Sequence, residues 1–178
     1  MNIITVTYNS DFFYIRPDIS LNRDGNDYFC PDNITEIAVA PFIYIRIDKA
    51  GKSIQSKFAH RYYSSIGYGV NLSGQSLIDN NIPQSFLMAN ALDNTTYISQ
   101  LYHPDEFPLE KLVQEFQNTL SAENGTAALL NIFNKKIEQI TSLSSVRTGD
   151  LIALELAYPV QKELNSSVKF GEIEFMIR

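Results

Sequence analysis

The sequence predicts a β-dominated α+β fold in a single domain spanning residues 1–178. Three observations support this prediction. Eight short apolar runs have the length and alternation of strands, whereas only two segments have helical spacing. A length of 178 residues is enough for one domain to bury its own core without disulfides or structural metals. No internal repeat, low-complexity tract or Gly/Pro/Ser-rich linker divides the sequence.

The predicted strands are runs of apolar and β-branched residues bounded by turn signals. They cover residues 3–8, 12–16, 37–47, 68–72, 95–102, 109–120, 151–156 and 169–177. The run at 37–47, IAVAPFIYIRI, is the strongest, because its odd-numbered positions form one apolar face. Pro41 interrupts this face and has no N–H to donate. The run is therefore predicted to be an edge strand or to be bulged at Pro41.

Residues 126–143 form the clearest predicted helix. Apolar residues recur there at three- and four-residue spacing, and polar residues occupy the other side. Gly125 and Thr126 supply a start. A second, shorter helix is predicted at 58–65. Turns are predicted where Gly, Asp and Asn gather, at 23–27, 48–53, 79–81 and 147–150.

Charge and composition exclude several classes of function. The chain has 14 Lys and Arg against 20 Asp and Glu, a net charge of −6. We expect no nucleic-acid partner, since the chain has no basic stripe that could release counterions. No membrane partner is expected either, because no apolar stretch approaches the roughly 20 residues of a membrane span. The first residues, MNIITVTYNSD, lack a cationic region and a small-residue cleavage site, so a cytoplasmic location is expected.

The residues alone nominate no active site. His60 lies in a predicted helix and is interpreted as a surface or capping residue. His103 stands beside Asp105 and Glu106, a group that could bind a metal but also has ordinary loop composition. Cys30 is the sole cysteine and has no cation nearby in the sequence, so it is expected to be structural and cannot form an intrachain disulfide.

Two stretches, from FFYIRP to GYGVNLSG and from ENGTAALL to RTGDLI, contain a series of anchors in a fixed order. These anchors are Arg16-Pro17, Asp24-Gly25, Pro31, Gly51-Lys52-Ser53 and Thr148-Gly149-Asp150-Leu151-Ile152. Over about residues 12–175 the pattern resembles the fumarylacetoacetate hydrolase superfamily, particularly its short, single-domain bacterial members. The resemblance implies a β-sandwich or roll with a few flanking helices, commonly in a homodimer. It also implies Mg²⁺ or Mn²⁺ chemistry on 2-oxo or 1,3-dicarbonyl acids, in which the metal stabilises an enolate.

The positions that align with the family's functional residues have changed. Ala40 and Phe42 replace two metal-binding carboxylates, and Asn71 replaces the third. Gln75 stands where the family has the arginine that follows this third ligand. Asn90 aligns with the lysine of the family's K-x-x-D motif, so Asp93 is the only residue of that motif that is kept. The family's TGTP segment aligns with residues 154–157, which include Glu155. Because a hard cation needs oxygen ligands, usually including carboxylates, we expect no Mg²⁺ or Mn²⁺ cofactor.

Three functions follow as hypotheses. The leading one is a degenerate, non-catalytic homologue whose scaffold serves oligomerisation, as a homodimer or with an active paralogue, or small-molecule binding. Apolar contacts would come from segments 12–15, 42–44 and 62–63, unless these are core. In a metal-free binder, Asn71, Gln75, Asn90 and Asn94 would supply neutral hydrogen bonds. The rival is a metal-dependent hydrolase or decarboxylase of 2-oxo or 1,3-dicarbonyl acids with a relocated site, built from His103, Asp105 and Glu106 or from Glu155 with Asp93.

Overall fold

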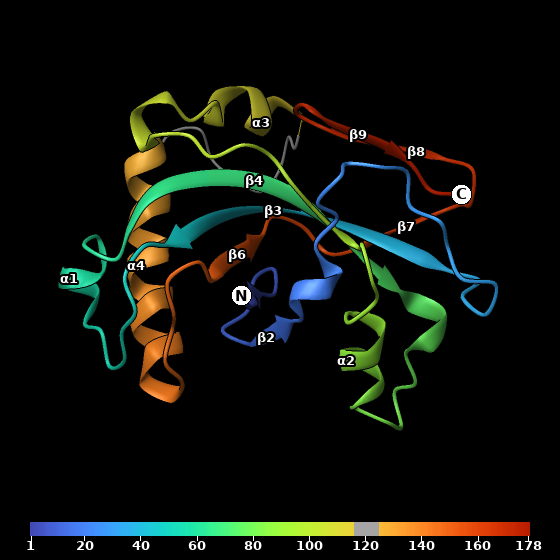
Figure 1. The fold of residues 1–178 in the computed structure, drawn as a ribbon, viewed down its shortest axis with the longest axis horizontal. Coiled ribbons are helices and arrows are strands. Elements are labelled where there is room, and N and C mark those ends of the chain that lie inside the picture. The colour runs from blue at the N-terminus through green and yellow to red at the C-terminus, as the bar shows by residue number, and fades with distance from the viewer. Residues whose placement is uncertain (116–124) are drawn as a thin grey trace.

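The structure is a computed structural model that describes residues 1–115 and 125–178 (Figure 1). Its strands are β1 (Ile3–Val6), β2 (Phe13–Arg16), β3 (Ile37–Ile47), β4 (Tyr63–Gly74), β5 (Thr96–Ile98), β6 (Leu151–Glu155), β7 (Val160–Lys162), β8 (Ser167–Phe170) and β9 (Ile173–Met176). Its helices are α1 (Ser56–Ala59), α2 (Ser85–Ala89), α3 (Leu109–Glu115) and α4 (Gly125–Leu143). Short 3₁₀ turns, η1 (Asp18–Ser20), η2 (Gln75–Leu77) and η3 (Pro104–Glu106), lie between them.

One mixed sheet dominates the described part of the chain. It contains seven strands, six of them in the order β2-β1-β6-β3-β4-β5, while β7 pairs with β3. The β1–β6 pair is parallel and the other pairs are antiparallel. Strands β8 and β9 form a separate hairpin. The predicted β-dominated α+β class is confirmed. No helix among the described residues is long and apolar enough to cross a membrane.

Both faces of β3 are covered, which explains why its run of apolar residues is so long. The odd-numbered residues of β3 other than Pro41 join the larger core, into which α4 packs Leu129, Phe133, Ile137 and Ile140. Phe42 and Tyr44 point the other way, into a smaller cluster with Ile3 and Leu151. In Figure 1, α4 runs across the direction of β3 and β4. The predicted helix at 126–143 is thus confirmed.

Pro41 lies in a central strand, so the prediction of an edge strand was wrong. On one side β3 pairs with β4 along its length. On the other side it pairs with β7 at residues 37–39 and with β6 at residues 42–46. Pro41 falls between these two partners, where its missing N–H breaks no ladder. Its carbonyl still accepts a hydrogen bond from Leu156 N at 2.9 Å, and the register shift lies farther along, between Ile45 and Ile47.

Several other predicted elements need correction. The segment predicted as a strand at 109–120 begins as helix α3, and residues 116–120 lie outside the described part. The helix predicted at 58–65 is the short α1, because β4 already begins at Tyr63. The strand predicted at 169–177 is the β8–β9 hairpin, which turns at Gly171 with φ +58°. Strand β7 and helix α2 were not predicted.

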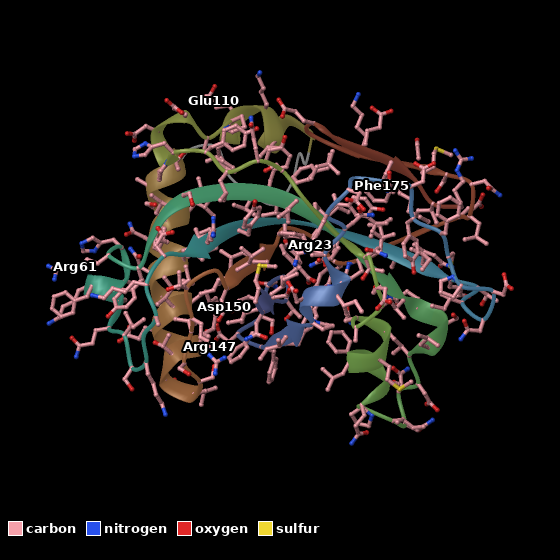
Figure 2. The ribbon with its side chains drawn as sticks, viewed as in Figure 1. Arg23, Arg61, Glu110, Arg147, Asp150 and Phe175 are labelled. Carbon is pink, nitrogen blue, oxygen red and sulfur yellow. The ribbon has the colours of Figure 1, made fainter. Side chains whose placement is uncertain are left out.

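The turn before β6 explains one anchor of the sequence pattern. Asp150 is buried, and its carboxylate accepts hydrogen bonds from Asn2 N and Arg147 N, both at 2.8 Å. Figure 2 shows Asp150 and Arg147 at this connection between α4 and β6. Gly149, with φ +91°, provides the left-handed conformation that the turn requires. Asp150 therefore joins the N-terminus to the sheet and has a structural role.

Candidate functional site

A small recess lies on the sheet face to which Phe42 belongs, between the ends of β3, β4 and β6. Its volume is about 90 Å³, and its walls are Thr7, Tyr14, Ala40, Asn71, Ser73, Gln75, Phe86, Asn90, Glu155 and Pro159. Strand register gathers them: Ala40 is opposite Asn71 on β4, and Phe42, two residues on, is opposite Glu155 on β6. Helix α2 closes one side, where the Phe86 ring contacts Tyr14 of β2 edge to face at 5.0 Å.

The structure brings together five of the seven positions that the sequence analysis marked as a changed site. Those that line the recess are Ala40, Asn71, Gln75, Asn90 and Glu155. Phe42 is buried next to it in the smaller apolar cluster. Asp93 and Asn94 line a different cavity of about 910 Å³, together with residues of the 22–31 loop. The structure therefore does not pair Glu155 with Asp93 in one cavity, as one version of the relocated site required.

Arg16, on β2, is fully buried behind the recess. Its Nε donates to Thr96 Oγ1 at 3.0 Å and its Nη1 to Asn90 Oδ1 at 2.9 Å. Its Nη2 donates to Thr95 Oγ1 at 2.7 Å and to the Leu72 carbonyl at 2.8 Å. None of these acceptors is a carboxylate. Burial lowers the pKa of Arg16, but a guanidinium stays protonated in proteins, so a positive charge lies beneath the recess.

Tyr14 connects this positive charge to the carboxylate of Glu155. The Tyr14 hydroxyl lies 3.1 Å from Glu155 Oε1 and 3.2 Å from Asn90 Oδ1, while Tyr8 N donates to Glu155 Oε2 at 3.3 Å. Desolvation raises the pKa of Glu155, and the hydrogen bond from Tyr14 opposes part of that rise. Desolvation and the negative charge of Glu155 raise the pKa of Tyr14 far above its usual value. Tyr14 therefore keeps its proton and donates it to its acceptors.

Asn71 presents a hydrogen-bond donor without a partner. Thr96 Oγ1 accepts from Arg16 Nε, so its own proton is available for Asn71 Oδ1, 2.9 Å away. In this arrangement the amide oxygen of Asn71 lies toward Thr96. Asn71 is only 2% exposed, and within the described residues its Nδ2 has no hydrogen-bond partner. A buried amide N–H without an acceptor is costly, and it points to a group that the recess accommodates.

The groups around the recess do not fit a divalent metal. Of the residues that the structure describes, only Glu155 brings a carboxylate to its walls, and the two lining positions that align with metal-binding carboxylates of the family, Ala40 and Asn71, carry no acidic group. No group of three or more His, Cys, Asp or Glu side chains among the described residues is arranged to hold a metal ion. His103 and Asp105 are exposed on η3, with Nδ1 and Oδ2 3.4 Å apart, so they do not form an enclosed site with Glu106.

A larger cavity adjoins the recess. Its volume is about 510 Å³, and it lies between the 6–11 segment, the end of β6 and α4, which contributes Leu129, Ile132 and Lys136. It shares Thr7 and Glu155 with the recess. A molecule with its smaller end in the recess could therefore extend past Glu155 into this cavity.

Sequence reasoning did not identify the roles of Tyr14 and Arg16. Their signal was the alternation in FYIR, which places both side chains on one face of β2. Arg16 was noted only as part of an anchor, because arginine is rarely fully buried. Cys30 Sγ donates to the Ile34 carbonyl at 3.3 Å, and burial raises the pKa of its thiol, so Cys30 is not an activated nucleophile.

Comparisons with known proteins identify the fold. No family model matches the sequence, and no curated protein matches it. A Yersinia pestis structure assigned to the fumarylacetoacetate hydrolase family aligns over 99% of this chain and 92% of its own, with 13% identity and a TM-score of 0.75. Fumarylpyruvate hydrolase from Pseudomonas aeruginosa, solved with Mn²⁺ and pyruvate, aligns over 94% and 82%, with 12% identity and a TM-score of 0.69.

An isomerase has the same architecture. The 5-carboxymethyl-2-hydroxymuconate delta-isomerase of Mycobacterium smegmatis aligns over 98% of this chain and 76% of its own, with 12% identity and a TM-score of 0.70. Because hydrolases and isomerases share this fold, the likeness does not decide the activity. The chain has the fold of the fumarylacetoacetate hydrolase family.

Proposed function

We propose that the chain is a non-catalytic homologue on this fold that binds a small molecule in the recess without a metal ion. The unpartnered Asn71 Nδ2 carries this proposal, since it is a buried donor without an acceptor in a residue that lines the recess. The rest of the recess is held in place by the hydrogen bonds of Arg16, Tyr14 and Asn90. A rigid, preorganised wall suits recognition, because little ordering is required on binding.

The donor set supports binding without a metal. Ala40 and Phe42 have no oxygen in their side chains, and Asn71 Oδ1 is already taken by Thr96. The remaining carboxylate, Glu155, is separated from the buried charge of Arg16 by Tyr14 and Asn90. Mg²⁺ binds through carboxylates and water in near-octahedral geometry, and these side chains do not provide such a set.

An acid–base enzyme is the second candidate, and the Tyr14–Glu155 contact favours it. A carboxyl group whose pKa is raised by desolvation is the kind of group that serves as a general acid. The substrates to assay are acylpyruvates, oxaloacetate and fumarylpyruvate, the last named after one structural neighbour. Turnover that Glu155→Gln abolishes would establish this second candidate and reject the first.

A thermal-shift titration with Mn²⁺ and with Mg²⁺, each with and without oxalate, tests the metal-free proposal. A species that binds only the native state adds about 2.7 kcal/mol of stability at 100 times its dissociation constant. That gain would raise the melting temperature by roughly 5–11 °C in a domain of this size. We expect no metal-dependent shift, with oxalate alone and EDTA as controls. A shift with metal that grows with oxalate would contradict the proposal.

We also propose that the chain works in the bacterial cytoplasm as a homodimer, with an active paralogue as the alternative partner. Segment 12–15 supports the dimer, because Phe12 is 82% exposed and Ile15 is 49% exposed. The other two segments considered for such a contact belong to the core: Phe42, Tyr44 and Tyr63 are buried. Large apolar side chains that stand in solvent are frequent at protein–protein contacts.

A further inference from the structure

The chemistry of the recess walls restricts the ligand. On the β4 side, Asn71 Nδ2 offers a donor and requires an acceptor. On the β6 side, Glu155 offers an acceptor, because each carboxylate oxygen can accept a second hydrogen bond beyond those from Tyr14 and Tyr8. A complementary group therefore carries an acceptor and a donor together. An ammonium or amidinium group has donors only and leaves Asn71 without a partner.

An anion would supply the acceptor that Asn71 Nδ2 requires, but the charges around the recess exclude an anionic ligand. Of the described residues, Glu155 is the only charged side chain on the recess walls, and the positive charge of Arg16 lies behind it, bound to neutral acceptors. The two formal charges balance. A carboxylate ligand would add a second negative charge beside Glu155 in a poorly solvated space, which is unfavourable. A neutral group meets both walls without this repulsion.

The volume of the recess limits the size of the ligand group that it can hold. A volume of about 90 Å³ is well below the roughly 300–1,000 Å³ of pockets that enclose a drug-sized ligand. A planar group of three or four heavy atoms fills such a space. The remainder of the ligand would then lie in the adjoining cavity of about 510 Å³, beyond Thr7 and Glu155.

We propose that the recess binds the neutral primary amide of a ligand, a carboxamide or a ureido group, with its carbonyl oxygen accepting from Asn71 Nδ2 and its NH₂ donating to the Glu155 carboxylate. This inference rests on the proposed metal-free binding function. It separates this chain from its metal-containing structural neighbour, which was solved with Mn²⁺ and the carboxylic acid pyruvate.

Three probes of equal size test the proposal: acetamide, acetate and acetamidinium. Each is titrated into the ¹⁵N-labelled full chain at neutral pH with EDTA, and the side-chain amide signal of Asn71, assigned by its loss in Asn71→Leu, is followed by NMR. We expect acetamide to shift this signal saturably, with a dissociation constant at least tenfold lower than those of the two ions. That ratio corresponds to about 1.4 kcal/mol.

Two variants locate the binding. Ala40→Leu fills the recess from β3, and we expect acetamide binding to weaken at least tenfold. Ala157→Leu is the matched control, because Ala157 lines another cavity with Val39 and Val160, and its binding should equal that of the wild type. Glu155→Gln removes the negative charge, so the affinity for acetate should rise at least tenfold.

The outcomes separate the inference from the function on which it rests. Acetate that binds the wild type as tightly as acetamide overturns the neutral-amide inference and leaves metal-free binding in place. Binding of any probe only after Mn²⁺ or Mg²⁺ is added overturns the proposed function itself. Acetamide that fails to move the Asn71 signal at molar concentration, or that binds equally to Ala40→Leu, overturns the inference.

Discussion

At the scale of single residues, Arg16 organises the site. Its guanidinium donates to Asn90, Thr95 and Thr96, which in turn orient Tyr14 and Asn71 at the recess. A buried charge is tolerated only when its hydrogen bonds are made, and here neutral acceptors make them. Because Arg16 is fully buried, its contribution is structural as well as electrostatic.

We predict that Arg16→Met lowers the free energy of unfolding by at least about 3 kcal/mol, because each buried acceptor left unpaired costs about 1–3 kcal/mol. Chemical denaturation measures this change. Arg23→Met is the control: the Arg23 side chain is 60% exposed in its pair with Asp18, and such pairs contribute about 0–1 kcal/mol. Equal effects of the two substitutions would contradict the central role of Arg16.

At the scale of elements, the sequence predicted what periodicity encodes. Strand β3 and helix α4 have long apolar patterns and were predicted nearly residue for residue. Strand β7, VQK, is exposed at every position, so it has no alternation to detect and forms only by pairing with β3. The segment LEKLVQE of α3 has apolar residues at i, i+3 and i+4, which is helical spacing, so the prediction of a strand there was wrong on the sequence pattern itself.

The candidate site, like the fold, was predicted from the sequence only in part. The alignment with the family's motifs identified Ala40, Asn71 and Glu155 as site positions, and the strand register brings these positions together. It did not reveal that Asn71 Nδ2 lacks a partner, since this depends on the bond from the Thr96 hydroxyl to Asn71 Oδ1, a tertiary contact. Periodicity gives the face on which a side chain lies, whereas its hydrogen-bond partners depend on tertiary contacts.

The β8–β9 hairpin is attached to the sheet through its turn. Gly171 has φ +58°, and a Cβ there would lie 2.6 Å from the ring of Tyr68. Tyr68 Oη also accepts a hydrogen bond from Glu172 N at 3.0 Å. Gly149→Ala is the matched case, because Gly149 has φ +91° and open space around its Cβ position.

We predict that Gly149→Ala costs about 1–2 kcal/mol, the penalty for a left-handed residue with a Cβ. Gly171→Ala should cost about 1–3 kcal/mol more, because the added methyl group also displaces Tyr68. Thermal or chemical denaturation of the two variants gives the difference. Equal losses would mean that the hairpin turn moves away from Tyr68 without cost.

At the scale of the whole molecule, the fold persists at 12–13% identity to its structural neighbours. Alternating apolar residues in β3 and β4 and the apolar face of α4 are sufficient for the core, and many sequences provide them. Metal chemistry depends instead on a few particular carboxylates. A change in those side chains therefore leaves the scaffold intact, which is what the proposed metal-free function requires.

Dimer formation is tested at the same scale. Phe12 is 82% exposed immediately before β2, the edge strand of the main sheet, and Ile15 and Ile19 nearby are exposed as well. We predict that sedimentation equilibrium gives a dimer and that Phe12→Ser raises its dissociation constant at least tenfold, which is about 1.4 kcal/mol of lost apolar contact. Phe29→Ser is the matched control, since Phe29 is 72% exposed on a different loop. A wild-type chain that is monomeric at all concentrations would contradict the homodimer, and equal effects of the two substitutions would contradict an interface at β2.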